Sequence, residues 1–346
     1  MSAHSFSRPV GVSKDFLDQS GNNVWGDIGL SGLDDAGVAW EYLPEDVPVL
    51  RPEDVEARPA LLFAAPAVDE STFAGVEQPP LVLARFGVGY DAVNLDACTA
   101  AGTAVTITPD GAQRPVATAA MGMLLGGLLN LGIKDRLVRE SRWDDRTRWM
   151  GRGLSGSTVG ILGFGSTGSE FARLLEPFGV EVLAYDPYCP PERAAMLGAR
   201  LVSRDELAAE SDAVVIMAVL SDETFHLVDE SFFRQMKPTA TLVNVARGPI
   251  VDESALIAAL QSGTIRAAAL DVFEDEPLHP TSPLLALKNV LLTPHCVAWT
   301  NEMSVGNGQS AVRAILDALD GRQPRFVVNR AVLEQSRWVQ DGEALA

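Results

Sequence analysis

Short apolar runs alternate with longer amphipathic stretches through most of the chain, a pattern typical of strands that alternate with helices. From Ser157 onward the order of strand, turn and helix repeats several times, and helical segments such as Glu253–Gln261 lie between most of the apolar runs. This order predicts a doubly wound parallel sheet. The predicted strands are Thr158–Leu162, Val180–Tyr185, Ala213–Met217, Thr239–Val245, Ala267–Leu270 and Val290–Leu292.

The first 110 residues repeat the alternation on a smaller scale and predict a second layer of strands and helices with a parallel sheet. The segment Thr108–Ala112 contains a proline and a glycine and predicts a domain junction. After it we expect a long helix, Arg114–Asn130, and beyond Gly132 a second helix, Lys134–Arg142, followed by a polar connector. The elements predicted before the junction are the strands Ala60–Ala64, Leu81–Ala84 and Thr103–Thr108 and the helix Leu95–Ala101.

The end of the chain is too short to form a domain of its own. After the last predicted strand the pattern gives one helix, Glu302–Leu319, and an extended tail. About 45 residues cannot bury a separate core, so we expect them to complete the N-terminal domain. The chain is therefore expected to have an α/β fold with two doubly wound parallel-sheet domains, residues 1–110 with 300–346 and residues 111–299.

A glycine-rich segment after the strand Thr158–Leu162 has the parts of a dinucleotide site. Gly163 allows the tight turn, Gly165 lets the backbone approach a pyrophosphate, and Gly168 lets the following helix pack close to the strand. The N–H groups of that helix, which begins near Ser166, would face the phosphates. The predicted contacts to the cofactor in this segment are Gly163, Gly165, Ser166, Thr167 and Gly168.

An acidic residue completes this motif. Asp186 lies 18 residues after Gly168, at the end of the next predicted strand. A carboxylate there can accept hydrogen bonds from both ribose hydroxyls of an adenosine, and it would repel a 2′-phosphate. No Arg or Lys occurs in Asp186–Pro190, so NAD is favoured over NADP.

Acidic residues outnumber basic ones, 46 to 27, which gives a formal net charge of −19. Nucleic-acid backbones and anionic membrane surfaces both attract basic proteins, so we expect no binding to nucleic acid or to a membrane. Any anionic substrate must then be bound by a local positive group.

Cysteine usage and the N-terminus indicate a cytoplasmic protein. The three cysteines, Cys98, Cys189 and Cys296, form no C-x-x-C pair and no disulfide framework. The first residues lack the apolar core of a signal peptide. The longest apolar stretch, Ala119–Leu131, is interrupted by glycine and too short to span a bilayer. We recognise no cluster of metal ligands and expect no metal.

Polar side chains come directly after predicted strands, at the edge where ligands bind in open α/β sheets. Arg247 follows Thr239–Val245, and its guanidinium can bind a carboxylate through two hydrogen bonds; the alternative is an Arg paired to a surface carboxylate. His295 follows Val290–Leu292, where Thr293 and Pro294 end the strand and orient the ring. An Arg, a Glu and a His that leave one side of one sheet beside a dinucleotide indicate an active site.

The segment Asp271–Pro277 carries four carboxylates at another strand end. Asp271, directly at the strand end, and Glu276, held by the proline that follows it, are the better candidates for chemistry. We interpret Glu274 and Asp275 as a solvated acidic loop.

Two further features are interpreted as structural rather than as parts of a binding or catalytic site. Gly87 and Gly89 follow a predicted strand and could expose N–H groups to an anion, but a simple turn between strand and helix is favoured on this evidence alone. His226 lies in the sequence Thr-Phe-His-Leu and is interpreted as a helix or surface residue.

Taken in order, these motifs resemble those of the D-isomer-specific 2-hydroxyacid dehydrogenases. The resemblance runs from about Leu81 to Trp299. It rests on Arg-Phe-Gly-Val-Gly-Tyr-Asp91, the glycine motif with Asp186, Asn-Val-Ala-Arg-Gly-Pro249, Leu-Asp-Val-Phe-Glu-Asp-Glu-Pro277 and Thr-Pro-His295.

The resemblance implies a Rossmann NAD domain inserted into a flavodoxin-like substrate domain. It implies that Arg247, Glu276 and His295 are the catalytic residues. Ala246 and Asp271 would contact the cofactor, Asp271 at the nicotinamide carboxamide. The backbone of Val88–Gly89, together with Arg247, would hold the substrate carboxylate.

The implied reaction is hydride transfer between NAD(H) and a small D-2-hydroxy acid or 2-oxo acid. His295 would exchange the proton with the substrate oxygen, and Glu276 would fix the tautomer of its ring. The family also implies a homodimer through the cofactor domain, for which the apolar segment Met121–Leu131 could supply the contact.

Three alternatives stay open. One is a relative that uses formate as its hydride donor. Another is phosphoglycerate oxidation, in which Arg85 could meet a phosphate. The third is an NAD-sensing binding protein like the corepressors that share this fold. The sequence leaves the identity of the 2-hydroxy acid open.

Overall fold

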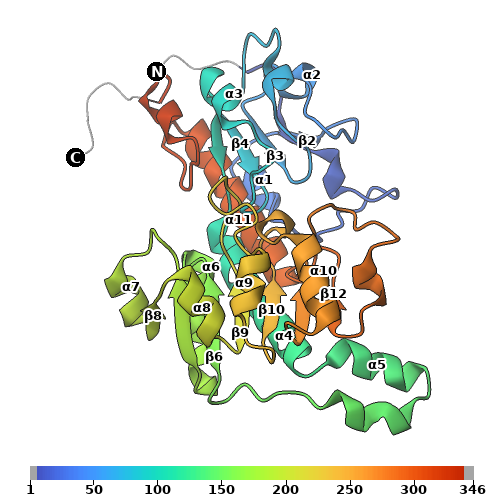
Figure 1. The fold of residues 1–346 in the computed structure, drawn as a ribbon. Helices are drawn as coiled ribbons and strands as arrows, with labels where there is room; N and C mark the ends of the chain where they lie inside the picture. Colours follow the sequence, from blue (N-terminus) through green and yellow to red (C-terminus); the bar gives the residue numbers. More distant parts are fainter. Residues whose placement is uncertain (1–5, 339–346) are drawn as a thin grey trace. The chain divides into compact units, whose positions relative to one another are not determined.

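The computed structural model describes residues 6–338 and separates the chain into two compact units, each with its own sheet (Figure 1). The first unit comprises Met1–Ala112 and Thr300–Ala346, and the second comprises Gln113–Trp299. The sequence placed the two domain boundaries after residues 110 and 299. Residues 1–5 and 339–346 of the predicted first domain lie outside the described part of the chain.

The first unit is built on a five-stranded parallel sheet with the strand order β2-β1-β3-β4-β5. This order is that of flavodoxin-like doubly wound sheets, as the family resemblance implied. The sequence predicted three of these strands and missed β1 and β2, because Gly11 and the exposed Glu41 interrupt their short apolar runs. The strands are β1 (Val10–Val12), β2 (Trp40–Tyr42), β3 (Ala60–Phe63), β4 (Val82–Arg85) and β5 (Ala104–Thr106).

Apolar side chains cover both faces of this sheet. On one face α11 (Asn301–Leu319) packs Ala311 and Ile315 into a core with Leu62. On the other face lies Cys98 of α3 (Leu95–Ala100), and burial raises the pKa of its thiol to about 12. The remaining helices of this unit are α1 (Ser31–Asp35), α2 (Pro52–Val55) and the 3-10 helices η1 (Lys14–Phe16), η2 (Glu70–Phe73) and η7 (Arg330–Glu334).

The second unit contains a seven-stranded parallel sheet with the order β12-β11-β10-β9-β6-β7-β8. With β6 numbered as strand 1 and the sheet read from β8 to β12, the order is 3-2-1-4-5-6-7. This is the strand order 3-2-1-4-5-6 of dinucleotide-binding sheets with β12 added at the edge. The six predicted strands are confirmed. The seventh, β8, was missed because the exposed Arg200 interrupts its short apolar run. The strands are β6 (Thr158–Leu162), β7 (Glu181–Tyr185), β8 (Ala199–Leu201), β9 (Ala213–Ile216), β10 (Thr241–Asn244), β11 (Ala267–Leu270) and β12 (Val290–Leu292).

Helices cover both faces of the second sheet as well. Met123 and Phe171, from α4 and α6, join Ile161 in the core of one face. Phe232 and Leu256, from α9 and α10, lie in the core of the other face. The helices are α4 (Pro109–Leu128), α5 (Leu131–Arg139), α6 (Ser166–Leu175), α7 (Pro191–Met196), α8 (Arg204–Glu210), α9 (Glu230–Gln235), α10 (Glu253–Ser262) and the 3-10 helices η3 (Trp143–Trp149), η4 (Glu176–Phe178), η5 (Gly248–Ile250) and η6 (Pro283–Ala286).

The helices α4 and α5 have other boundaries than the two helices predicted after the junction. The helix α4 begins at Pro109 rather than at Arg114, because a proline at the first helical position gives up no hydrogen bond. It ends at Leu128, and the break comes at Asn130, whose φ of 57° is left-handed, rather than at Gly132. Within residues 6–338 no single helix is long and apolar enough to cross a membrane; α4 and α5 reach that length only together, with a bend of 63° between them.

Candidate active site

Three neighbouring strands of the second sheet carry the predicted catalytic residues at their carboxyl ends. The strands β10, β11 and β12 lie side by side and are parallel. Arg247 follows β10, Glu276 follows β11, and His295 follows β12. Because the strands are parallel, all three loops leave the same edge of the sheet, and the glycine loop after β6 leaves that edge too.

Glu276 and His295 form a hydrogen-bonded pair. The Oε2 atom of Glu276 lies 2.7 Å from Nδ1 of His295, while Oε1 accepts a hydrogen bond from the backbone N–H of Phe273 at 3.0 Å. The carboxylate is therefore held by its own loop and fixes the ring through one nitrogen. The side chains of His295 and Glu276 are 46% and 34% exposed, so the pair is open to a ligand.

The turn that presents His295 is organised by Asp271. The Oδ1 atom of Asp271 accepts hydrogen bonds from the Thr293 hydroxyl at 2.7 Å and from the N–H groups of Cys296 and Val297, both at 3.1 Å. Its carbonyl oxygen accepts the N–H of His295 at 2.7 Å. These bonds hold His295 at a φ of 51°, which few residues other than glycine adopt. The buried Asp271 is thus an anchor for the turn; its predicted contact with the nicotinamide stays a prediction.

The loop that carries Arg247 is shaped by its neighbours in the sequence. The side chain of Asn244 donates to the carbonyl of Arg247 at 2.9 Å and accepts the N–H of Ala246 at 3.0 Å. Gly248 then packs on the next loop, where a Cβ atom would lie 1.7 Å from the carbonyl oxygen of Phe273. The backbone after Arg247 therefore touches the loop of Glu276, and only a glycine permits that contact.

The interpretation of Glu274 as part of a solvated loop is wrong. Its Oε1 atom lies 2.8 Å from Nε2 of His226, and its Oε2 atom accepts the N–H of Glu253 at 3.1 Å. The side chain is 33% exposed. His226 lies in a turn, and its ring is held by this carboxylate rather than lying free on the surface. This pair could not be predicted from local patterns, because its partners lie 48 positions apart in the chain.

The glycine motif forms the predicted tight turn. A Cβ atom at Gly163 would lie 2.4 Å from the backbone nitrogen of Ala218, and one at Gly168 would lie 2.3 Å from the carbonyl oxygen of Gly163. Around Gly165, no described atom outside the immediate chain lies within 4 Å of the corresponding position, which leaves room for a phosphate. The helix α6 begins at the next residue, Ser166, so the N–H groups of its first turn face an anion placed there.

Asp186 is fixed at the end of β7 by two backbone donors, Phe164 N–H at 2.7 Å and Tyr188 N–H at 2.9 Å. The Tyr188 hydroxyl donates to Glu223 at 2.6 Å, and this hydrogen bond raises the pKa of Tyr188. Two carboxylates therefore lie in this corner of the unit. Tyr188 connects them, since its N–H bonds to Asp186 and its hydroxyl to Glu223.

Cys296 follows His295 directly in the chain. Burial, with a contribution from Asp271, raises the pKa of the Cys296 thiol and makes it a poor nucleophile. Within residues 6–338, no group of three or more His, Cys, Asp and Glu side chains is arranged to hold a metal ion.

Comparison with known proteins identifies the family. Residues 121–297 match the family described as D-isomer specific 2-hydroxyacid dehydrogenase, NAD binding domain. A glyoxylate reductase of Thermococcus onnurineus is 36% identical over 306 residues, which cover 87% of this chain and 89% of the relative. The chain belongs to the D-isomer-specific 2-hydroxyacid dehydrogenases.

Other members of the family show how far the likeness extends. A D-3-phosphoglycerate dehydrogenase of Archaeoglobus fulgidus is 38% identical over 74% of this chain but only 48% of its own length, so this chain spans about half of that relative. The crystal structure of a glyoxylate reductase from Paecilomyes thermophila superposes with a TM-score of 0.80 at 26% identity, over 93% of this chain and 98% of that one. As a D-2-hydroxyacid dehydrogenase, the chain is a nicotinamide-dependent oxidoreductase that acts on CH–OH donors.

The remaining predicted site of this D-2-hydroxyacid dehydrogenase lies in the first unit, in the loop after β4. Gly87 has a φ of 132°, and its N–H and carbonyl groups both bond to Thr108, at 2.8 Å and 3.0 Å. The next residue, Val88, is exposed. The turn therefore presents the Val88–Gly89 backbone at the surface of its unit, and its contact with a substrate carboxylate stays a prediction.

Proposed function

We propose that this protein interconverts a small D-2-hydroxy acid and the corresponding 2-oxo acid with NAD(H), and that His295 and Glu276 are its acid–base pair. The observation that carries the proposal is the 2.7 Å contact between Glu276 and Nδ1 of His295. This pair leaves the same edge of the sheet as Arg247 and the dinucleotide loop.

His295 would act as the proton donor and acceptor. Since Glu276 occupies Nδ1, the proton exchanged with the substrate oxygen is carried on Nε2. In reduction the imidazolium gives that proton to the developing alkoxide, and in oxidation the neutral ring removes it from the alcohol. The carboxylate also stabilises the imidazolium by its charge.

Arg247 would bind the substrate carboxylate and polarise its carbonyl group. A guanidinium stays charged at every working pH and donates hydrogen bonds in a fixed fork. Placed beside the carbonyl oxygen, it would stabilise the negative charge that develops during reduction. The bonds from Asn244 and the packing at Gly248 hold the loop that presents it.

The cofactor would be held by Gly163, Gly165, Ser166, Thr167, Gly168 and Asp186, with Ala246 and Asp271 near its nicotinamide end. When bound, it supplies or accepts the hydride at the substrate carbon. Asp186 and Glu223 support NAD over NADP, because both carboxylates would oppose a 2′-phosphate.

We further propose a cytoplasmic homodimer. The three cysteines are free, as expected in a reducing compartment. Much of the segment Met121–Leu131 is core rather than surface, since Met123, Leu124 and Leu128 are buried. The contact is better supplied by exposed apolar residues at the end of this segment and beyond it, such as Leu131 and Trp143. Light scattering at about twice 36.9 kDa would support the dimer.

The proposed reaction is tested by NADH consumption with glyoxylate, hydroxypyruvate, pyruvate, phenylpyruvate and phosphohydroxypyruvate. Glyoxylate comes first because the Thermococcus glyoxylate reductase matches nearly the full chain. Turnover of one of these acids, with NADH bound more tightly than NADPH and a D product, is the expected result. If NADH binds but no 2-oxo acid is reduced, the protein is a binding protein rather than an enzyme.

A further inference from the structure

A second histidine–glutamate pair lies beside the proposed catalytic pair. His226, in the loop between β9 and α9, places Nε2 2.8 Å from Oε1 of Glu274. Glu274 belongs to the same loop as Glu276, which binds His295. Two carboxylates separated by one residue thus hold two different histidines.

Glu274 connects three segments of the second unit. Besides His226, its Oε2 atom accepts the N–H of Glu253, the first residue of α10, at 3.1 Å. In return, the backbone N–H of Glu274 donates to Oε2 of Glu253 at 3.2 Å. The loop after β9 and the start of α10 are therefore both bonded to the loop that carries Glu276.

His226 is itself held firmly. Its φ of 50° is left-handed, and its N–H donates to the carbonyl of Pro249 at 2.8 Å. The ring of Phe225 stacks on the imidazole with centroids 4.0 Å apart. Two residues later, Val228 donates to the carbonyl of Ile250 at 3.0 Å. The imidazole is thus a fixed partner for Glu274 rather than a mobile surface group.

We propose that Glu274 and His226 are positioning residues for the reaction, which hold the loop of Glu276 so that its carboxylate meets His295. The inference rests on the proposed function. The path is short: Phe273, next to Glu274, donates its N–H to Oε1 of Glu276 at 3.0 Å. Without the bonds of Glu274 the Phe273 N–H shifts, and the Glu276 carboxylate shifts with it.

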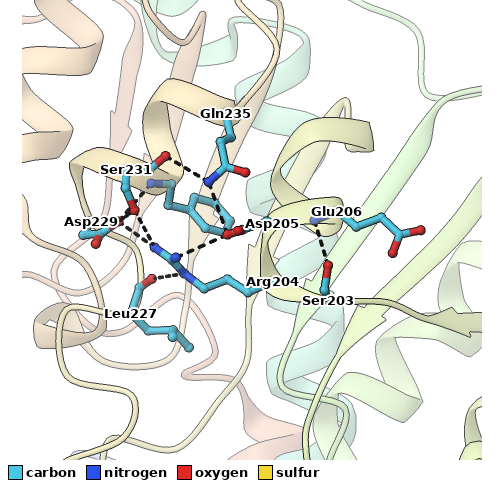
Figure 2. Close-up of polar contacts among 9 residues, drawn as sticks. Ser203, Arg204, Asp205, Glu206, Leu227, Asp229, Ser231 and Gln235 are labelled. Atoms are coloured by element: carbon cyan, nitrogen blue, oxygen red, sulfur yellow. Dashed lines mark hydrogen bonds and ion pairs between the residues drawn. The ribbon is translucent and has the colours of Figure 1, made fainter.

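A polar cluster at the other end of the His226 loop offers a matched control. Figure 2 shows Arg204 of α8 with its guanidinium directed at Asp229 and Ser231. Its Nη2 atom lies 2.6 Å from Oδ1 of Asp229, and its Nε donates to the carbonyl of Leu227 at 3.0 Å. The same oxygen of Asp229 accepts the N–H of Phe232 and caps α9. This cluster anchors the loop through α8 and α9.

The first experiment compares kcat, KM and the Kd of NADH for substitutions in the two clusters. Glu274→Ala and His226→Asn should each lower kcat about ten-fold with little change in NADH affinity, because they misplace the acid–base pair. Asparagine tolerates the left-handed backbone but is too short to reach Glu274. His226→Gln, whose amide nitrogen can reach it, should restore most of kcat. Asp229→Ala should lower the Tm and leave kcat unchanged.

A double substitution identifies the route. If Glu274 acts through Glu276, then Glu274→Ala should cause almost no further loss of kcat in a Glu276→Ala background, where no carboxylate is left to position. A ten-fold loss in that background as well would overturn the proposal, and so would an equal loss of kcat in Asp229→Ala. Unchanged kcat in both Glu274→Ala and His226→Asn would overturn it too.

Nitrogen NMR of the histidine rings gives a readout without turnover. In the protein without substrate, Glu274→Ala and Glu276→Gln should move the ring nitrogen signals of His295 in the same direction, and Asp229→Ala should leave them in place. If His295→Ala keeps full turnover, the proposed function fails, while the NMR result still reports on Glu274. If His295→Ala abolishes turnover but Glu274→Ala changes neither kcat nor the His295 signals, only this inference fails.

Discussion

The two histidine–glutamate pairs of the second unit have the same chemistry and different surroundings. The His295 side chain is 46% exposed, whereas His226 is 32% exposed and is stacked against Phe225. Glu276 bonds to its own loop, whereas Glu274 also bonds to the start of α10. An open ring held from one side is the arrangement that the proposed proton transfer requires, because the free nitrogen must reach the substrate. A ring packed on one face, whose carboxylate partner also bonds elsewhere, is suited to holding loops together.

The largest difference between the pairs should appear on removal of the rings. His295→Ala should lower kcat about 10²–10⁴-fold, which is the usual contribution of general acid–base catalysis to a rate. The Kd of NADH should be nearly unchanged. This loss should exceed the effect of His226→Asn by at least about ten-fold. Steady-state kinetics and fluorescence titration with NADH check both points, and equal losses at the two histidines would remove the distinction.

Gly248→Ala should disturb both pairs at once. The new Cβ would lie 1.7 Å from the carbonyl oxygen of Phe273, so the loop that carries Glu274 and Glu276 must move. A displacement of about 1 Å in a catalytic group can cost about 100-fold in rate. We expect a loss of that order in kcat together with a lower Tm. Gly165→Ala, where the described atoms leave open space, is the matched substitution and should weaken NADH binding while kcat at saturating NADH changes little.

Glu276→Gln should separate the charge of the catalytic pair from its geometry. The amide keeps an acceptor for Phe273 but no longer stabilises the imidazolium. We expect kcat for ketone reduction to fall about 10–50-fold. Steady-state kinetics with a 2-oxo acid and NADH check this loss. An unchanged kcat would show that the charge of the carboxylate is not needed and that it only orients the ring.

The smallest expected effect concerns stability. Burial raises the pKa of Glu253 above 4.5 in the folded protein. The Glu253 carboxyl therefore binds its proton more tightly in the folded state than in the unfolded state. The bound proton stabilises the folded protein below pH 4.5, and this stabilisation is lost as the pH rises through the raised pKa of Glu253. Glu253→Gln should thus have a slightly higher Tm than the parent at pH 7, with the difference vanishing near pH 4. A difference independent of pH would exclude titration of Glu253 as its cause.

The sequence predicted the sheets well because most strands are apolar runs bounded by clear turns. It missed β1, β2 and β8, whose short apolar runs are interrupted by Gly11, Glu41 and Arg200. It also began the second helix after Gly132, whereas α5 begins at Leu131, because Asn130 and Gly132 are both able to interrupt a helix and only the backbone shows which one does.

For the site, the sequence placed Arg247, Glu276 and His295 directly after strands of one parallel sheet, and the structure has them there, while their catalytic roles stay a prediction. It did not find the bonds that hold them. Asp271 anchoring the His295 turn, Gly248 against Phe273, and Glu274 with His226 all depend on contacts between loops that are far apart in the chain. Such contacts follow from the strand order, which local patterns do not specify.

The most direct test of the central claim is a crystal structure with NAD and a non-reacting 2-oxo acid analogue. The account predicts Nε2 of His295 within about 3 Å of the 2-oxo oxygen, Glu276 still bonded to Nδ1, and His226 bonded to Glu274 away from the ligand. A ligand held by His226, or a His295 ring directed away from the oxygen with Glu276 unpaired, would contradict it.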